Sequence, residues 1–595
     1  MMIEIIVATN RASLGRDART FILYLLAAAV LHFPHYGSFI GDITRDFYLH
    51  YNWAKEFAEN FALGNPYPRW MFHGRLGLGE PVFIFYAPLH YYAVALVSLL
   101  GLSAWAAMQV VAMISTTVFA WFVYKTCAYY AEARLSAMIG LVALASPFLV
   151  MLNYKFDGLA WATMGYASHG FLFWALFRPG ASRNIINVWA AIAIGVAVGS
   201  HIISALVNLV CYSATALFPV AGSERLSIRL ARSIISWVVT VALGLALSGI
   251  YLVPALAYLD VIRTAVWDPV TPFTAFAWPV VTQFIYEQRW FSFQWTIPLP
   301  ALALVVVPFA YALVHKDAPV PLLKAISVGA FAVFFASELS FPIWALHTPL
   351  EKIQLPFRFI SLAYTLGIVA AGLAIAHARP AGRKAWSLAL WSILALSFLT
   401  GALSLVKASY LDGRKLPPQL ANNQYTFLPF VQRLHDEGEC AGGEAGGDTA
   451  CLLSWGPSGS FRGTPEYRLK WAGPNYPKYA KGGFAAECVV KGVACGPQQR
   501  TATGLKWEVT SSAPQSLVLP LFHFPSWATE IDGKRVEHTI DPATGLITVE
   551  IPAGTYGIQT VWTLSSIERY GLYLSVAALL IVCAVPMLRR LPGKS

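Results

Sequence analysis

Three titratable side chains lie close together in a polar segment that follows the first apolar stretch of the chain. Asp42, Asp46 and His50 fall within nine residues, and Asp46 and His50 share one helix face at i, i+4 if this segment is helical. A carboxylate at a partly desolvated interface has its pKa raised toward the range of a general base. Asp46 is therefore a candidate base for an acceptor hydroxyl, and His50 a candidate to orient that carboxylate or to bind a phosphate.

The same three residues also admit less specific interpretations. An Asp-x-x-x-His spacing is a weak motif by itself, and such residues also serve as solvating groups at a membrane–water interface. A divalent metal held by Asp42, Asp46 and His50 is a further alternative, but the sequence places no fourth ligand beside them. Two carboxylates and one imidazole are a weak basis for a metal site, so we predict neither a metal nor another cofactor.

Further candidate binding residues stand at the expected outer ends of apolar segments. An arginine at that level can pair bidentately with a phosphate, so Arg358 is a candidate phosphate ligand, with Gln354 beside it in the run EKIQLPFRF. The alternative for Arg358 is a snorkelling interfacial anchor. Lys155 and Asp157 follow an earlier apolar segment. The remaining candidates for substrate binding lie in or next to the first loop: Arg69, Trp70, Glu80, Tyr86 and His90.

The composition shows what kind of molecule must position these residues. The chain has 595 residues, of which 57% are hydrophobic and only 12% charged, against about 25% charged in soluble domains. Apolar runs of about 17–22 residues recur, long enough to cross a hydrocarbon core as helices, and they do not alternate as barrel strands do. The net charge of +11 falls largely in short loops, where it sets topology rather than nucleic-acid binding. The fold class is therefore a polytopic α-helical membrane protein.

Basic clusters between the apolar segments predict how the chain threads the membrane. The expected segments cover residues 21–33, 89–102, 106–125, 135–152, 166–178, 184–199, 201–219, 233–256, 297–315, 322–341, 359–378, 386–405 and 570–588. Arginine and lysine clusters such as Arg379, Arg383 and Lys384 are expected inside, together with both termini, which demands an even number of crossings. One segment, 89–102 or 166–178, is then re-entrant or a half-helix, and about twelve full spans are expected.

A change of composition marks the domains. Residues 1–406 form the expected transmembrane core, with a large first loop over 35–88 on the outer side. Residues 407–567 form an outer β-rich domain, and 568–595 a final helix with a short inner tail. Short strands are expected at 515–522, 546–551 and 556–563, separated by turn signals such as Asp532-Gly533. A small antiparallel sandwich is the natural architecture for this domain.

Seven cysteines divide between the two parts of the chain. Cys127, Cys211 and Cys583 lie in apolar segments, where a free cysteine behaves as a small hydrophobe. The other four lie in the polar domain: Cys440, Cys451, Cys488 and Cys495. Their short spacings favour two disulfides, 440–451 and 488–495, and an oxidising compartment. A zinc site is the competing interpretation, but the sequence of this domain has no CxxC pair.

The first loop carries the most specific pattern. The runs beginning at Asp46 (DFYLH), Pro68 (PRW), Gly77 (GLGEP) and Phe83 (FIFYAPLHYY) resemble a bacterial family known as the 6-pyruvoyl-tetrahydropterin-synthase-related membrane domain. That family is similar to the GT-C superfamily of membrane glycosyltransferases. The run QLPFRF and the tail motifs that begin at Phe524 (FPSW) resemble the same proteins and the related YfhO-type membrane proteins.

The resemblance implies a function and its site. It implies an inverting transfer of sugar from a polyprenyl-phosphate donor to an acceptor glycan or lipid of the cell envelope. The chemistry would lie on the periplasmic side of the bacterial inner membrane, among membrane lipids. It implies Asp46 as the base, with Asp42 as the alternative, and Arg358 as a contact of the donor phosphate. The paired aspartates of some GT-C members are not clear here, since only Asp157 stands near that point.

Two other function classes remain open at this stage. A flippase or transporter of a lipid-linked glycan would place charges at the bilayer midplane and show inverted repeats, whereas the charges here cluster at helix ends and we see no repeat. A non-catalytic assembly factor would tolerate the loss of Asp46 and Arg358.

Overall fold

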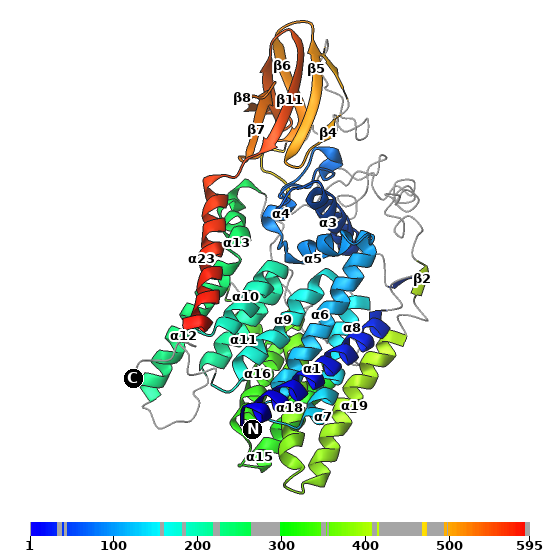
Figure 1. The fold of residues 1–595 in the computed structure, drawn as a ribbon, viewed down its shortest axis with the longest axis vertical. Helices are drawn as coiled ribbons and strands as arrows, with labels where there is room; N and C mark the ends of the chain where they lie inside the picture. The colour runs from blue at the N-terminus through cyan, green and yellow to red at the C-terminus, as the bar shows by residue number, and fades with distance from the viewer. Residues whose placement is uncertain are drawn as a thin grey trace.

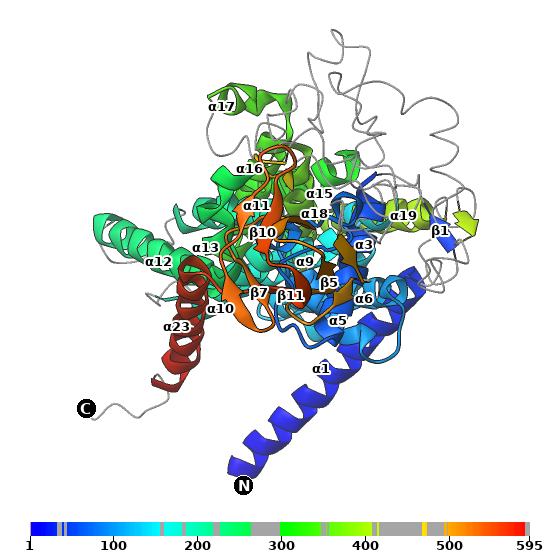
Figure 2. The same cartoon turned by 90° about the horizontal axis from the view of Figure 1, so that it is seen from above.

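The structure, a computed structural model, describes residues 2–32, 38–40, 45–154, 160–180, 186–217, 226–262, 298–346, 353, 356–406, 413–415, 467–472, 493–496 and 498–588. It shows a helical body with a β domain at one end (Figure 1). Viewed along the long axis, the β domain lies over the helical body, and α1, α12 and α23 lie at the periphery (Figure 2). Seven residues singled out above lie outside the described ranges: Asp42, Lys155, Asp157, Gln354, Cys440, Cys451 and Cys488.

Most of the helices follow the predicted apolar segments, but α1 begins earlier than predicted, and α3 and α4 lie in the expected first loop. Their bounds are α1 (Met2–His32), α3 (Arg45–Ala62), α4 (Val82–Phe85), α5 (Leu89–Ser98), α6 (Ala104–Cys127), α7 (Ala133–Leu144), α8 (Pro147–Tyr154), α9 (Ala160–Phe177), α10 (Val188–Ser200), α11 (Ile202–Leu217), α12 (Leu226–Leu247), α13 (Gly249–Ala257), α15 (Pro298–Val314), α16 (Val320–Ala336), α17 (Phe341–Trp344), α18 (Ile360–Ala378), α19 (Lys384–Val406) and α23 (Ser566–Leu588). Six of the described helical stretches are long and apolar enough to cross a membrane. The chain is therefore a multi-pass membrane protein, as predicted.

The helices of the body differ in burial and in length, as α18 and α5 show. α18 lies at the centre of the helical body, because 94% of the residues in its apolar stretch are buried. Most residues in the apolar stretches of α12, α19 and α23 are not buried, as suits helices that face lipid. α18 and α15 approach closely at Gly367, where an added Cβ would lie 2.7 Å from the Leu304 Cβ. α5 has ten residues and is about 15 Å long, half of a hydrocarbon core. It is therefore too short to cross the membrane.

The β domain consists of two antiparallel sheets. One has the order β6-β10-β9, and the other has the order β3-β5-β11-β7-β8, with β4 also paired to β5. The strands are β3 (Val493–Cys495), β4 (Gln499–Arg500), β5 (Gly504–Ser511), β6 (Gln515–Phe522), β7 (Trp527–Ile531), β8 (Lys534–Val536), β9 (Thr539–Ile540), β10 (Leu546–Ile551) and β11 (Gly554–Trp562). Alternate residues of β5 and β6 are buried in one common core. The predicted strands and the sandwich are confirmed. A separate antiparallel pair, β1 (Ser38–Ile40) and β2 (Gly413–Lys415), joins the segment after α1 to the segment after α19.

The first loop and the β domain share that core. Trp70 of the loop packs against Phe524, Trp527 and Trp562 of the domain, with ring centroids 5.5–5.9 Å apart. The Phe522 amide also donates to the Leu78 carbonyl, at 3.0 Å. Burying aromatic rings of this size contributes about 1.5–3 kcal/mol each. The loop is thus a structural part of the β domain rather than a free connection.

The last helix anchors the β domain to the body. α23 packs against α13 through small residues, because an added Cβ at Gly571 would lie 2.6 Å from the Gly249 carbonyl oxygen. The Ile250 amide donates to the Ser575 hydroxyl at 2.8 Å. Close backbone approach through small residues is the usual way in which helices associate in lipid. Of the seven cysteines, Cys127, Cys211 and Cys583 are free. Cys495 is disulfide-bonded, with a partner outside the described residues, so the predicted pairing stays a prediction.

Two histidines of the β domain predict a pH-dependent stability. His523 Nδ1 and His538 Nε2 lie 3.1 Å apart, and burial, helped by the His538 imidazole, lowers the pKa of His523 to about 4. The unfolded chain, with an ordinary pKa of about 6.5, binds the proton first, so falling pH favours unfolding.

We therefore expect the melting temperature of the full chain in detergent to fall as the pH is lowered from about 6.5 to about 4. In His523→Asn the fall should be smaller. A variant that loses stability with pH as steeply as the unmodified chain would contradict the assignment to His523.

Candidate functional site

Helix α3 carries the first-loop motif and has a buried apolar face. In α3 the apolar residues Trp53, Ala54 and Phe57 recur at helical spacing, and all three are buried. Asp46 is the second residue of α3 and stands four residues before His50. The two positions therefore lie one turn apart on the same helix face, as predicted.

A buried carboxylate, Glu56, connects α3 to the first loop and to the β domain. Glu56 is fully buried and accepts hydrogen bonds from the backbone amides of Phe72 and His73. Its side chain also lies 3.1 Å from His73 Nδ1 and 2.9 Å from the Arg500 guanidinium of β4. Burial alone would raise the pKa of Glu56, but His73 and Arg500 outweigh it and hold the pKa below its usual value. The carboxylate is therefore charged and fully engaged.

Two more buried ion pairs fix the loop. The Arg69 guanidinium lies 3.3 Å from Glu568 of α23 and also donates to the Ile250 carbonyl of α13. Arg75 lies 3.3 Å from Glu80, and both are buried. Broken buried pairs are costly because a charge is left uncompensated. Each pair therefore determines where its part of the loop lies.

The turn between these pairs depends on glycine. Gly79 has φ +85, in the left-handed region that favours glycine. An added Cβ there would lie 1.9 Å from the Trp70 indole nitrogen. The GLGEP motif therefore reflects close packing of this turn against Trp70.

Aromatic and imidazole rings surround His50. His50 Nδ1 lies 2.6 Å from the Tyr91 hydroxyl, and its ring centroid lies 4.8 Å from Trp53 and 5.0 Å from Tyr86. His90 of α5 is also buried, and no ring-nitrogen hydrogen bond to it is present among the described residues. Burial first, and then the neighbouring imidazoles, hold the pKa of His50 well below its usual range. His50 is therefore neutral at ordinary pH.

A second polar cluster lies inside the helical body next to Arg358. Arg358 belongs to the short 3-10 turn Pro356–Phe359 that precedes α18, and its guanidinium lies beside the Tyr166 phenol of α9 and near His201. The Tyr166 and His201 rings lie 5.8 Å apart. His169 of α9 contacts Ser361 at 3.1 Å, and Ser361 donates to the Arg358 carbonyl at 2.7 Å. The arginine thus stands at the edge of a hydrogen-bonded interior.

His201 connects the two groups of residues. The imidazoles that depress the His50 pKa after burial are those of His90 and His201, and His201 in turn lies near Arg358. α9 and α11 approach closely here because position 165 is glycine, where an added Cβ would lie 2.7 Å from the His201 Cβ. His201 therefore interacts electrostatically with residues of both groups.

The structure separates the predicted candidates into two groups. His50, Tyr86, His90 and Arg358 lie in or beside the site just described. Arg69, Trp70 and Glu80 are engaged by protein partners within the loop scaffold, and their roles in substrate binding stay predictions. The roles of the residues outside the described ranges also stay predictions.

The sequence interpretation did not single out Tyr166, His169 or Asn208. Asn208 of α11 contacts His169 of α9. The signal for Asn208 was a polar stripe, since His201, Ser204 and Asn208 recur at i, i+3 and i+7. Such spacing marks one helix face, and polar residues inside a membrane helix face the bundle interior. The described residues hold no group of three or more histidine, cysteine, aspartate or glutamate side chains able to bind a metal. The prediction of no metal remains untested.

Comparison with solved structures finds proteins of related helical arrangement. Arabinofuranosyltransferase AftD from Mycobacteria matches at 15% identity and a TM-score of 0.42, over 71% of this chain and 29% of that one. ArnT from Cupriavidus metallidurans, bound to undecaprenyl phosphate, matches at 15% identity and 0.40, over 66% of this chain and 77% of that one. The apo Archaeoglobus fulgidus oligosaccharyltransferase matches at 12% and 0.42, over 79% of this chain and 63% of that one.

The likeness is limited to the fold. This chain spans less than a third of the length of AftD, and we draw no functional conclusion from similarity at this level. No family model matches the sequence. No curated protein matches it either. The resemblance to the 6-pyruvoyl-tetrahydropterin-synthase-related and YfhO-type families stays a prediction.

The role of Glu56 as a connector can be tested with a matched neighbour. Glu56→Ala leaves Arg500 and His73 without their buried carboxylate, so we expect the free energy of unfolding to fall by about 3–5 kcal/mol. Glu59→Ala removes a carboxylate that is 39% exposed and lies 3.8 Å from Arg500, and should cost less than about 1 kcal/mol. Unfolding in detergent, followed by tryptophan fluorescence, measures both, and equal losses would contradict the assignment.

Proposed function

We propose that this protein is an inverting membrane glycosyltransferase of the GT-C type. It transfers a sugar from a polyprenyl-phosphate donor to an acceptor glycan or lipid. The reaction takes place at the outer face of the bacterial inner membrane, where the first loop and the β domain lie.

One observation carries the proposal. His50 of the first-loop helix interacts electrostatically with His201, and His201 with Arg358. In the sequence, about 150 residues separate His50 from His201, and about as many separate His201 from Arg358. In the proposed mechanism a general base on α3 and Arg358, in the turn before α18, serve one reaction space. Donor phosphate and acceptor hydroxyl must meet within a few ångströms for attack.

In this proposal the donor phosphate binds Arg358. A guanidinium presents a planar fork of donors that fits two phosphate oxygens. Arg358 stands just before the buried helix α18 and is partly exposed, which suits a headgroup at the membrane surface with its isoprenoid tail in lipid. We propose Gln354 and Lys155 as further contacts of the same phosphate.

Asp46 then acts as the base. Its carboxylate takes the proton of the acceptor hydroxyl while the acceptor oxygen attacks the anomeric carbon from the face opposite the phosphate. The bond between that carbon and the phosphate oxygen breaks, and its electron pair leaves with the phosphate, whose added negative charge Arg358 stabilises. One displacement of this kind inverts the anomeric centre. Asp42 is the alternative base.

The surroundings of α3 suit this role. His50 is neutral and contacts Tyr91, so it lines this face of α3 without adding charge. Tyr86, half-buried beside it, offers a ring face on which a sugar can stack. We assign Arg69, Glu80 and Trp70 a positioning role, because each is engaged within the scaffold.

A transfer assay tests the proposal. The purified full chain in lipid is supplied with a panel of radiolabelled polyprenyl-phosphate sugars and a membrane extract as acceptor source. We expect Asp46→Asn to lower transfer by at least about a hundredfold, the effect of losing a general base. Asp42→Asn serves as the alternative arm.

The control for this assay is Asp260→Asn, which changes an exposed aspartate in the turn after α13 and should leave transfer unchanged. Transfer that survives both Asp46→Asn and Asp42→Asn would remove these aspartates from the mechanism. If the unmodified protein moves lipid-linked sugar across vesicles without transferring it, the protein is a flippase and the proposal is wrong.

A further inference from the structure

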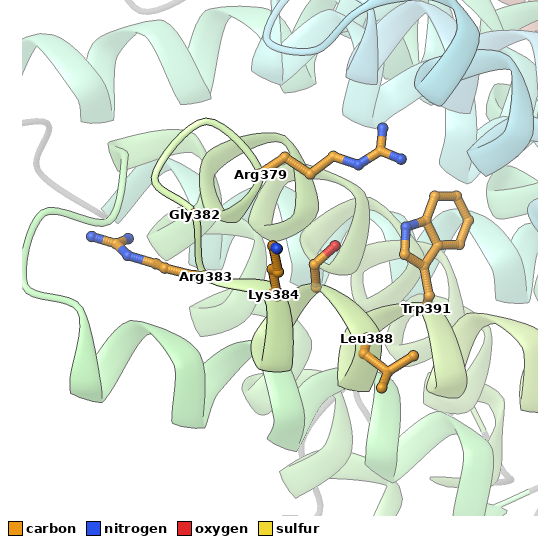
Figure 3. Close-up of a pocket in the computed structure, with 7 residues that line it drawn as sticks. Arg379, Gly382, Arg383, Lys384, Leu388 and Trp391 are labelled. Atoms are coloured by element: carbon orange, nitrogen blue, oxygen red, sulfur yellow. The ribbon is translucent and has the colours of Figure 1, made fainter.

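A pocket of about 360 Å³ lies at the turn between α18 and α19 (Figure 3). Its lining residues come from the end of α18, the turn and the first two turns of α19: Arg379, Gly382, Arg383, Lys384, Ser387, Leu388 and Trp391. Nothing in the proposed reaction uses this pocket.

The pocket is remote from the proposed reaction site. Arg358 precedes α18 and Arg379 follows it. The helix has 19 residues and is therefore about 28 Å long. This is close to the thickness of a hydrocarbon core, about 30 Å. The pocket therefore lies at the opposite membrane surface, on the side away from the β domain.

The turn is held in place by Arg383. Its guanidinium donates to Asp317 and to the Tyr311 hydroxyl, each at 2.8 Å, and Tyr311 also contacts His377 at 2.7 Å. The hydrogen bond from Arg383 holds the pKa of Asp317 below its usual value, so this carboxylate stays charged. In the close-up the Arg383 guanidinium points away from Arg379 and Trp391 (Figure 3). Arg383 thus holds the turn in place, and its own charge is paired with Asp317 rather than directed at a ligand in the pocket.

Lys384 and Arg379 supply the positive charge. Lys384 is exposed. Among the described residues on this face, ion pairs join Arg379 to Glu132 and Arg383 to Asp317, and neither involves Lys384. Arg379 lies 3.2 Å from Glu132 through one guanidinium nitrogen, which leaves its other donors for a ligand. Ser387, in the first turn of α19, also lines the pocket, and the amino end of a helix favours an anion. Together these groups suit a phosphate.

The apolar side of the pocket indicates where the phosphate comes from. Leu388 is 70% exposed, and Leu396, Leu399 and Leu403 continue along the same exposed face of α19. Acyl chains of a lipid seated in the pocket would lie along this face. Trp391 lines the pocket, and Tyr129 and Tyr130 are exposed on the neighbouring turn after α6. Aromatic rings of this kind mark the headgroup level of a membrane.

We propose that this pocket binds the headgroup phosphate of an anionic phospholipid from the leaflet away from the β domain. Lys384, Arg379 and Ser387 contact the phosphate, and the leucine face of α19 holds an acyl chain. The lipid binds between α18 and α19 without taking part in the transfer reaction. Basic pockets between transmembrane helices are known to bind anionic headgroups.

The test uses the full chain in detergent and native mass spectrometry. Phosphatidylglycerol, phosphatidylcholine, glycerol 3-phosphate and inorganic phosphate are titrated separately. We expect phosphatidylglycerol to bind at least about fivefold more tightly than phosphatidylcholine, because each basic side chain near a membrane surface contributes about that factor. The two soluble phosphates should bind far more weakly, since they lack the acyl chain.

Two variants and one control locate the site. Lys384→Gln should weaken phosphatidylglycerol binding about fivefold, and Arg379→Gln with Lys384→Gln about twentyfold. Lys316→Gln changes an exposed lysine of the α15–α16 turn that does not line the pocket and should change binding less than about twofold. All three changes are at exposed positions, and melting temperatures check that each variant is folded.

Three outcomes would overturn the proposal. Equal binding of phosphatidylcholine would exclude recognition of the anionic headgroup. Equal binding of glycerol 3-phosphate would make this a site for a soluble phosphate. An equal effect of Lys316→Gln would show that general surface charge, not this pocket, attracts the lipid.

Discussion

The buried carboxylate of Glu56 is the constraint on which the outer half of the molecule depends. A charge taken out of water is tolerated only where it is fully paired, and Glu56 finds its partners in three places: the backbone at residues 72–73, His73, and Arg500 of the β domain. Helix α3, the first loop and the β sandwich can therefore satisfy Glu56 only in one arrangement. The shared aromatic core around Trp70 adds the apolar burial that stabilises it.

In that arrangement α3 also packs against the helical body. His50 lies a turn and a half before Glu56 in the same helix, where it meets Tyr91 and the neighbouring His90 and His201. On the other side Arg358 is held by the hydrogen bonds that link its own turn to Ser361 and His169. One support is built on the β domain and the other on α18, and residues of both interact electrostatically with His201. A reaction between a membrane-anchored donor and an external acceptor needs such a junction.

The sequence predicts much of this fold, for identifiable reasons. Apolar length located most of the helices but not α3, which lies in the expected first loop. Short strand-like runs between turn signals located β6, β10 and β11. The loop motifs pointed to the right segment, but not to what each residue does. Arg69 pairs with Glu568, almost 500 positions away, and no local pattern reveals such a partner. The polar stripe of His201 and Asn208 is readable in the sequence, yet its meaning depends on Arg358 lying beside it.

The most direct test of the account is an experimental structure of Asp46→Asn in lipid with a bound polyprenyl-phosphate sugar. If Asp46 is the base, as proposed, the substitution stops transfer and preserves the complex. We expect the donor phosphate within about 3 Å of the Arg358 guanidinium, with the sugar between it and α3. A phosphate bound elsewhere, with the sugar out of reach of position 46, would contradict the central claim that α3 and Arg358 serve one reaction site.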